Sequence, residues 1–207
     1  MTRQKSTDTA RQSDATGPGL HWRPGPERYI CVYCGSKSGG HTRYAAVAQA
    51  LGEAIANRGY GLVYGGGGIG LMGCVADAVL QAGAPVLGII PRALMARELG
   101  HRNITELVVV DDMHQRKAMM TSRATAFVAM PGGYGTLEEL FEMLAWLQLE
   151  IHDRPVGLLN PGGYFDHLMT FLDHAMGEGF LHAEHRALLR TGDDPTALLD
   201  ELLSPNV

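Results

Sequence analysis

The chain has 207 residues, 45% of them apolar, and a formal net charge of −5 at pH 7. This length and composition indicate one ordinary globular domain with a complete hydrophobic core. An acidic balance without a long basic run argues against nucleic acid as a partner, and no segment reaches the roughly 18–20 apolar residues that span a membrane.

The N-terminal segment, residues 1–27, is rich in Thr, Ser, Gln, Gly, Arg and Pro and lacks the apolar core of a secretory signal. We therefore expect a disordered tail over residues 1–27 and one folded domain over residues 28–207. Three cysteines are too few for a disulfide framework, so a reducing, cytoplasmic compartment is the default expectation.

From Arg28 onward, short apolar runs alternate with segments of helical periodicity. The predicted strands are Tyr29–Cys34, Tyr60–Tyr64, Pro85–Ile90, Leu107–Val110, Thr125–Met130 and Pro155–Leu159. The predicted helices are Thr42–Arg58 with Thr42 as its N-cap, Leu71–Gln81, Met113–Arg123, Leu137–Leu149, Tyr164–Met176 and Pro195–Leu203. This order predicts an α/β fold, a Rossmann-like parallel sheet with helices on both faces. Ligands of such folds bind at the carboxyl ends of the strands, near helix N-termini.

Two residue pairs raise the question of metal or redox chemistry. Cys31 and Cys34 form a C-x-x-C, but residues i and i+3 of a strand point to opposite faces, so we interpret both as core cysteines. His182 and His185 are the only close histidine pair, and no acid or cysteine cluster accompanies them, so we place them at the surface. We expect neither a metal site nor a cofactor.

A first glycine loop, Gly65–Gly73, follows a predicted strand and opens a helix. Gly65, Gly67 and Gly70 satisfy G-x-G-x-x-G, the dinucleotide-binding pattern. That pattern also requires an acid at the end of the next strand, and none follows Ile90, which argues against an NAD-linked oxidoreductase. Two interpretations stay open: a tight turn with close helix–sheet packing, and a loop that lines a phosphate or sugar pocket.

The second glycine loop, Pro131–Glu139, reads P-G-G-Y-G-T-L-E-E and also leads from a strand into a helix. Glycines let the backbone approach a ligand, and the free N–H groups of a helix start favour an anion. Thr136 is predicted to cap the helix and to donate its hydroxyl to a phosphate oxygen. Glu139 falls in the first turn, where it serves either chemistry or merely a capping box with Thr136. The related stretch Pro161–Tyr164 lacks the threonine and glutamate and predicts an ordinary turn into a helix.

Two cations, Arg116 and Lys117, stand in the first turns of the predicted helix Met113–Arg123. Cations are unfavourable at a helix N-terminus, so their presence suggests a local anion, although a solvated helix face is the alternative. Glu142 lies three residues after Glu139, on the same helical face. Three roles stay open for it: lining the ribose site, contacting solvent, or joining a dimer interface.

Pro131–Glu139 matches P-G-G-x-G-T-x-x-E, and the sequence thereby resembles the Lonely Guy (LOG) family, cytokinin-activating phosphoribohydrolases long mislabelled as lysine decarboxylases. The pair Arg116-Lys117, the loop Gly65–Gly73 and the run Trp146–Pro155 are also similar to segments of that family. The resemblance covers about Arg28 to Leu203. It implies a Rossmann-like dimer that hydrolyses cytokinin riboside 5′-monophosphates, and AMP as well, to free base and ribose 5-phosphate.

The resemblance also implies roles for individual residues. Arg116 and Glu139 are the implied catalytic pair. The implied substrate-binding residues are Glu98, Lys117, Gly132, Gly133, Tyr134, Gly135 and Thr136, of which the glycines and Thr136 hold the phosphate. For the implied homodimer, we expect the helix Leu137–Leu149 at the interface.

A second hypothesis is a carrier that binds a nucleotide or cofactor without turnover. A carrier has no need of a carboxylate beside the anomeric carbon, so the presence of Glu139 and Arg116 favours the enzyme. The residues leave open whether the natural substrate is AMP or an N6-prenylated AMP.

Overall fold

Strands and helices alternate through residues 28–95 and 99–204, the parts of the chain that the computed structural model describes. The predicted tail over residues 1–27 lies outside them. The strands are β1 (Tyr29–Tyr33), β2 (Gly61–Tyr64), β3 (Val86–Pro91), β4 (Glu106–Val110), β5 (Ala124–Ala129), β6 (Val156–Leu159) and β7 (Leu189–Gly192). The helices are α1 (Thr42–Asn57), α2 (Gly70–Gln81), α3 (Met113–Arg123), α4 (Tyr134–Gln148), α5 (Asp166–Gly177), α6 (Ala183–Arg186) and α7 (Pro195–Leu203), with short 3₁₀ turns η1 (Arg92–Leu94) and η2 (Pro161–Gly163).

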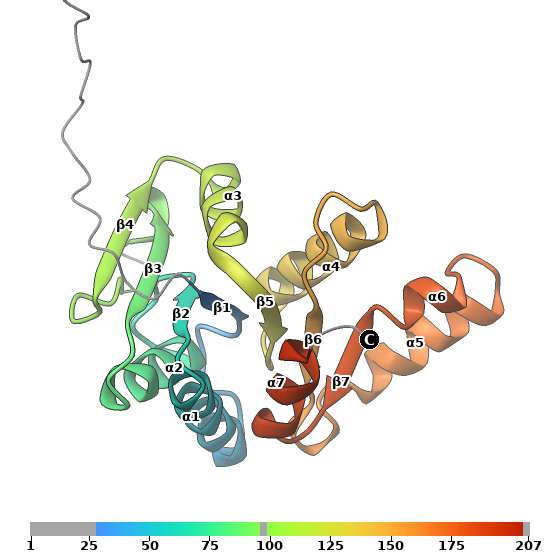
Figure 1. Ribbon diagram of the computed structural model, residues 1–207, viewed down its shortest axis with the longest axis horizontal. Coiled ribbons are helices and arrows are strands. Elements are labelled where there is room, and N and C mark those ends of the chain that lie inside the picture. The colour runs from blue at the N-terminus through green and yellow to red at the C-terminus, as the bar shows by residue number, and fades with distance from the viewer. Residues whose placement is uncertain (1–27, 96–98, 205–207) are drawn as a thin grey trace, which may run out of the picture.

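The strands form one parallel sheet in the order β4-β3-β2-β1-β5-β6-β7 (Figure 1). β1 lies at its centre, with Ile30 in register with Leu62 of β2 and with Ala126 of β5. The chain first builds the sheet outward from β1 to β4 and then returns to add β5 on the other side. This reversal makes the carboxyl ends of β1 and β5 the expected place for a ligand.

Helices cover both faces of the sheet (Figure 1), as the complete burial of β1 requires, because its side chains point alternately to the two faces. Ile30 and Val32 pack with α1, α2 and α7, whereas Cys31 and Tyr33 pack with α3, α4 and α5. All five residues of β1 are buried, and each large apolar side chain removed from water contributes about 1.5–3 kcal/mol. The predicted Rossmann-like α/β architecture is confirmed.

Three local features differ from the prediction. Thr42 is not the N-cap of α1, because the helix begins at Thr42 itself and His41 occupies the cap position without a side-chain hydrogen bond. The sequence analysis also missed β7 and the short α6. β7 is an edge strand in which Leu189 alone is buried, so it lacks the apolar run that marked the other strands. No helix within the described residues is long and apolar enough to cross a bilayer.

Candidate active site

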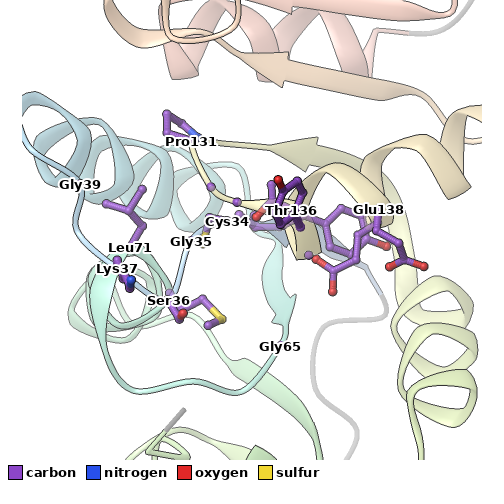
Figure 2. A pocket seen from close by; sticks show the side chains of 18 of the residues that line it. Cys34, Gly35, Ser36, Lys37, Gly39, Gly65, Leu71, Pro131, Thr136 and Glu138 are labelled. Atoms are coloured by element: carbon purple, nitrogen blue, oxygen red, sulfur yellow. The ribbon is translucent and has the colours of Figure 1, made fainter. Parts of the chain in front are cut away.

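A cavity of about 590 Å³ opens at the carboxyl ends of β1, β2 and β5, where the strand order reverses. Its walls come from the loop after β1, from Gly65 after β2, and from the segment Pro131–Glu139 after β5 (Figure 2). Among the predicted site residues, Arg116, Gly132, Gly133, Tyr134, Gly135, Thr136 and Glu139 line it. Lys117 does not appear in its lining, and Glu98 lies outside the described residues.

The helix that carries the P-G-G-x-G-T-x-x-E segment begins earlier than predicted. α4 starts at Tyr134 with Gly133 at the cap position, instead of at Leu137 with Thr136 as the cap. The glycines of this segment had suggested a loop, but the backbone is helical from Tyr134 onward, Gly135 included, while Gly133 is extended. Thr136 is therefore inside the first turn, and Glu139 is in the second turn. The predicted Thr136 cap, and with it the capping-box interpretation of Glu139, is wrong.

Three polar or charged side chains are buried within the described part of the chain, and all three line this cavity. Arg116 is 5% exposed, Thr136 is 4% exposed and Glu139 is 8% exposed. Arg116 Nη2 lies 3.9 Å from Glu139 Oε1. Withdrawing ionised groups from water costs several kcal/mol each, and the attraction between paired charges often fails to repay this cost, so a buried Arg–Glu pair beside a cavity is characteristic of a functional site.

Arg116 is held between the two glycine loops. Its Nη2 donates a hydrogen bond to the Gly65 carbonyl oxygen at 3.3 Å, and a Cβ at Gly65 would collide with the same nitrogen. The first glycine loop thus lines the pocket at Gly65. The other interpretation of that loop, a tight turn with close packing, applies at Gly70. Its φ is +63°, and it approaches the Ser36 backbone so closely that no side chain would fit.

Helix α3 points Arg116 inward because of how it starts. Asp112 caps it by accepting a hydrogen bond from Gln115 N at 2.8 Å, which fixes the first turn against the sheet. Arg116 and Met120, one turn apart, are the buried residues of α3. The interpretation of Arg116 as part of a solvated helix face is therefore wrong.

Lys117, the next residue, points to a second set of carboxylates beside the cavity. Its Nζ lies 2.6 Å from Glu138 Oε1 and 2.9 Å from Glu142 Oε1. Burial lowers the pKa of Lys117, but hydrogen bonds and charges of the two carboxylates outweigh burial and raise that pKa above its ordinary value. Glu142 thereby joins α4 to α3, and its buried Oε2 has no hydrogen-bond partner among the described residues. We name Lys117, Glu138 and Glu142 the α3–α4 clamp.

A family model described as possible lysine decarboxylase matches residues 72–202 of the chain. The chain is 49% identical over 168 residues to the probable cytokinin riboside 5′-monophosphate phosphoribohydrolase LOGL1 of Oryza sativa subsp. japonica, which covers 81% of this chain and 74% of the relative. It is also 49% identical over 173 residues to the cytokinin riboside 5′-monophosphate phosphoribohydrolase LOG5 of Arabidopsis thaliana, covering 84% of this chain and 76% of that one. The chain belongs to the LOG family.

Solved structures with the same fold include the molybdenum cofactor carrier protein from Chlamydomonas reinhardtii, with a TM-score of 0.63 and 22% identity over 86% of this chain and 99% of that one. The molybdenum cofactor binding protein from Rippkaea orientalis gives a TM-score of 0.63 and 19% identity, over 86% of this chain and 98% of that one. At these identities the likeness shows that this LOG chain shares their fold, and nothing further.

Several polar residues that line the cavity of this LOG chain were not predicted to be near it. Ser36 and Lys37 come from the loop after β1, Tyr44 comes from α1, and Tyr164 follows η2. The Tyr164 hydroxyl donates a hydrogen bond to the Gly132 carbonyl oxygen at 2.6 Å, so the second P-G-G-Y stretch is a turn that also supports the first. For Ser36 and Lys37, position in the sequence was the available signal, because the loop after the first strand of a Rossmann-like sheet borders the ligand.

The remaining candidate residues lie away from the cavity or are buried beneath it. Cys31 and Cys34 belong to core clusters on opposite faces of the sheet, and burial raises the pKa of both thiols well above the ordinary value. The core-cysteine interpretation is confirmed. His182 is exposed and His185 is half-buried, with ring centroids 5.6 Å apart. No group of three His, Cys, Asp or Glu residues suited to a metal occurs in the described part of the chain.

Proposed function

We propose that this LOG-family chain hydrolyses the N-glycosidic bond of cytokinin riboside 5′-monophosphates, and of AMP, to the free base and ribose 5-phosphate. The observation that carries the proposal is the burial of Arg116, Thr136 and Glu139 around one cavity of nucleotide size. The names of relatives such as LOGL1 and LOG5, at 49% identity, support the same activity.

The phosphate binds at the N-terminus of α4 in this proposal. The first N–H groups of a helix have no intrahelical acceptors, and together with the helix dipole they attract an anion. Gly133 and Gly135 each leave open space where a Cβ would stand, so a phosphate has access to the backbone there. Thr136 adds a hydroxyl that lines the cavity and makes no side-chain hydrogen bond within the described residues.

In this proposal the ribose lies beside Glu139. Three residues along a helix advance about 4.5 Å, and Thr136 and Glu139 line the same cavity, which supports a sugar next to the carboxylate when its phosphate is at the helix start. As the bond between C1′ and N9 breaks, positive charge develops on the sugar, and an adjacent carboxylate stabilises it. Glu139 also orients the attacking water, whose oxygen bonds to C1′.

Arg116 acts on the opposite charge. The electron pair of the broken bond leaves with the purine, which finally takes one proton of the attacking water. A guanidinium stays charged at any physiological pH, so Arg116 serves as an electrostatic stabiliser of the departing base instead of as its proton donor. Its 3.9 Å separation from Glu139 keeps both charges in the cavity without a direct hydrogen bond between Nη2 and Oε1.

The cavity also has an apolar side, which supports acceptance of an N6-prenyl group. Leu71, Met72, Leu94 and Met113 line it, and Met113 is 38% exposed. These side chains offer a surface on which an alkyl substituent loses contact with water.

Product analysis tests the proposal. Purified protein is incubated separately with AMP and with isopentenyladenosine monophosphate, and base and ribose 5-phosphate are quantified by chromatography. We expect equal amounts of the two products from each nucleotide, and the ratio of the two rates gives the base preference. Nucleotide binding without product release would support the carrier hypothesis instead.

We also propose that the chain forms a homodimer through the C-terminal part of α4 and the residues after it. Phe141, Leu149 and Ile151 leave apolar surface exposed there, with Leu149 at 65% and Ile151 at 61%. Sedimentation velocity is expected to give a dimer for the native chain and a monomer for Leu149→Glu. A native monomer at micromolar concentration would contradict this proposal.

A further inference from the structure

We propose that Lys37 binds the 5′-phosphate of the substrate and makes the cavity selective for nucleotides over uncharged nucleosides. The proposal rests on the proposed function for the identity of the ligand, but it assigns a residue outside both signature segments. Lys37 lies in the loop after β1 and lines the cavity (Figure 2).

Among the described residues that line the cavity, Lys37 is the cation available to a ligand. The other charged lining residues are Arg116, Glu138 and Glu139. Arg116 lies 3.9 Å from Glu139, and Glu138 is paired with Lys117 at 2.6 Å. The Lys37 side chain forms no ion pair or hydrogen bond with any residue in the described parts of the chain. A phosphate dianion in the cavity would supply the counter-charge.

The backbone that carries Lys37 is fixed between the two glycine loops. Gly35 N donates to the Pro131 carbonyl oxygen at 3.0 Å, and the Gly35 carbonyl accepts from Leu71 N at 3.1 Å and from Met72 N at 3.3 Å. Gly70 packs so closely against Ser36 and Lys37 that a Cβ there would collide with both backbones. The lysine therefore projects from a preorganised loop, which reduces the entropy lost when it binds a ligand.

This loop lies beside the start of α4. A Cβ at Gly35 would stand 3.2 Å from the Lys37 carbonyl oxygen and 3.3 Å from Gly132 Cα, so Lys37 and the P-G-G segment flank Gly35. Figure 2 shows Lys37 and Ser36 across the cavity from Thr136 and Glu138. On that opposite side, Thr136 is 4% exposed, and its hydroxyl makes no hydrogen bond in the described residues. This hydroxyl is therefore available to the same phosphate. In the proposal, the flexible four-carbon stem of Lys37 extends from this loop toward a phosphate at the N-terminus of α4.

A lysine in this place discriminates by charge. A phosphate monoester carries about −1.5 to −2 charges near pH 7, whereas adenosine carries none. A charge-assisted hydrogen bond contributes about 1.5–3 kcal/mol, which corresponds to roughly a tenfold or larger preference for the nucleotide.

The test compares Lys37→Met and Lys37→Arg with the native chain. We measure kcat/KM for AMP and for adenosine, and inhibition by inorganic phosphate. The ratio of the AMP and adenosine values is expected to fall at least about tenfold in Lys37→Met and to recover largely in Lys37→Arg. Inorganic phosphate should inhibit Lys37→Met more weakly than the native chain. Arg43→Met, an exposed cation of the neighbouring helix α1 that does not line the cavity, is the matched control and should keep the native ratio.

An unchanged ratio in Lys37→Met, or an equal loss for both substrates, would overturn the proposal. A native chain that releases no base from AMP would refute the proposed function instead. In that case titration calorimetry with AMP still decides the role of Lys37, because weaker binding to Lys37→Met supports it and equal binding refutes it.

Discussion

Replacement of Lys117 by methionine tests whether the α3–α4 clamp holds the two catalytic candidates in place. Methionine retains most of the apolar stem and removes the charge that pairs with Glu138 and Glu142. The Lys117 and Glu142 side chains are 11% and 21% exposed, so their ion pair is largely withdrawn from solvent, whereas Glu138 is 52% exposed.

The expected loss of stability follows from these exposures. Breaking a buried ion pair by removing one partner costs about 3–5 kcal/mol, and an exposed pair contributes about 0–1 kcal/mol. The partly buried clamp falls between these cases, and we expect Lys117→Met to lower the free energy of unfolding by about 2–3 kcal/mol. For a domain of this size the Tm should fall by about 4–12 °C. Lys117→Met combined with Glu142→Gln should recover about 1 kcal/mol, because the stranded carboxylate is removed.

The same variants separate a positioning role from direct substrate binding. If the clamp aligns Arg116 with Glu139, Lys117→Met lowers kcat for AMP more than it raises KM, and Lys117→Arg preserves both. Urea unfolding and steady-state kinetics on the same preparations give both quantities. A tenfold higher KM with stability within 0.5 kcal/mol of the native value would refute the clamp and make Lys117 a substrate ligand, as the family resemblance implies.

Two further predictions concern the backbone at the cavity and the pH dependence of stability. A Cβ at Gly132 would collide with the Thr136 hydroxyl, so Gly132→Ala should lower both stability and activity. Gly135→Ala points into open space and should fold at least as stably yet bind AMP at least tenfold more weakly by calorimetry, and unimpaired binding would contradict a phosphate at that position. Burial lowers the pKa of His152 below its ordinary 6.5, against the raising effect of its hydrogen bond to a backbone carbonyl. The folded state thus binds a proton less readily than the unfolded state, and stability should fall as pH drops below about 6.5. Between about pH 7 and pH 5, the free energy of unfolding from urea titrations should decline less steeply in His152→Gln than in the native chain. An identical decline would contradict the assignment of this pH dependence to His152.

The sequence was most informative where a local signal and the fold agreed. The helices Met113–Arg123 and Pro195–Leu203 have the predicted bounds, because Asp112 and Asp194 accept capping hydrogen bonds immediately before them. The placement of Arg116 and Glu139 at one cavity also followed from strand–helix order, since parallel strands end at the same edge of the sheet.

Features that depend on tertiary contacts could not be predicted in this way. The start of α4 was placed late because Gly135 has low helix propensity, which the packing of the helix against β5 overrides. The cavity position of Lys37 depends on contacts between its loop and both glycine loops, and these join segments far apart in the chain. The pairing of Lys117 with Glu138 and Glu142 likewise joins two helices whose relative orientation no local pattern encodes.

Base release by Glu139→Gln tests the central claim most directly. Glutamine keeps the size and hydrogen-bonding ability of the side chain but lacks the negative charge that the cationic ribose requires. With AMP as substrate, we expect folded Glu139→Gln to have a kcat about 10²–10⁴-fold below the native value, while the neighbouring Glu138→Gln costs no more than about tenfold. A kcat for Glu139→Gln equal to the native value would contradict the carboxylate mechanism.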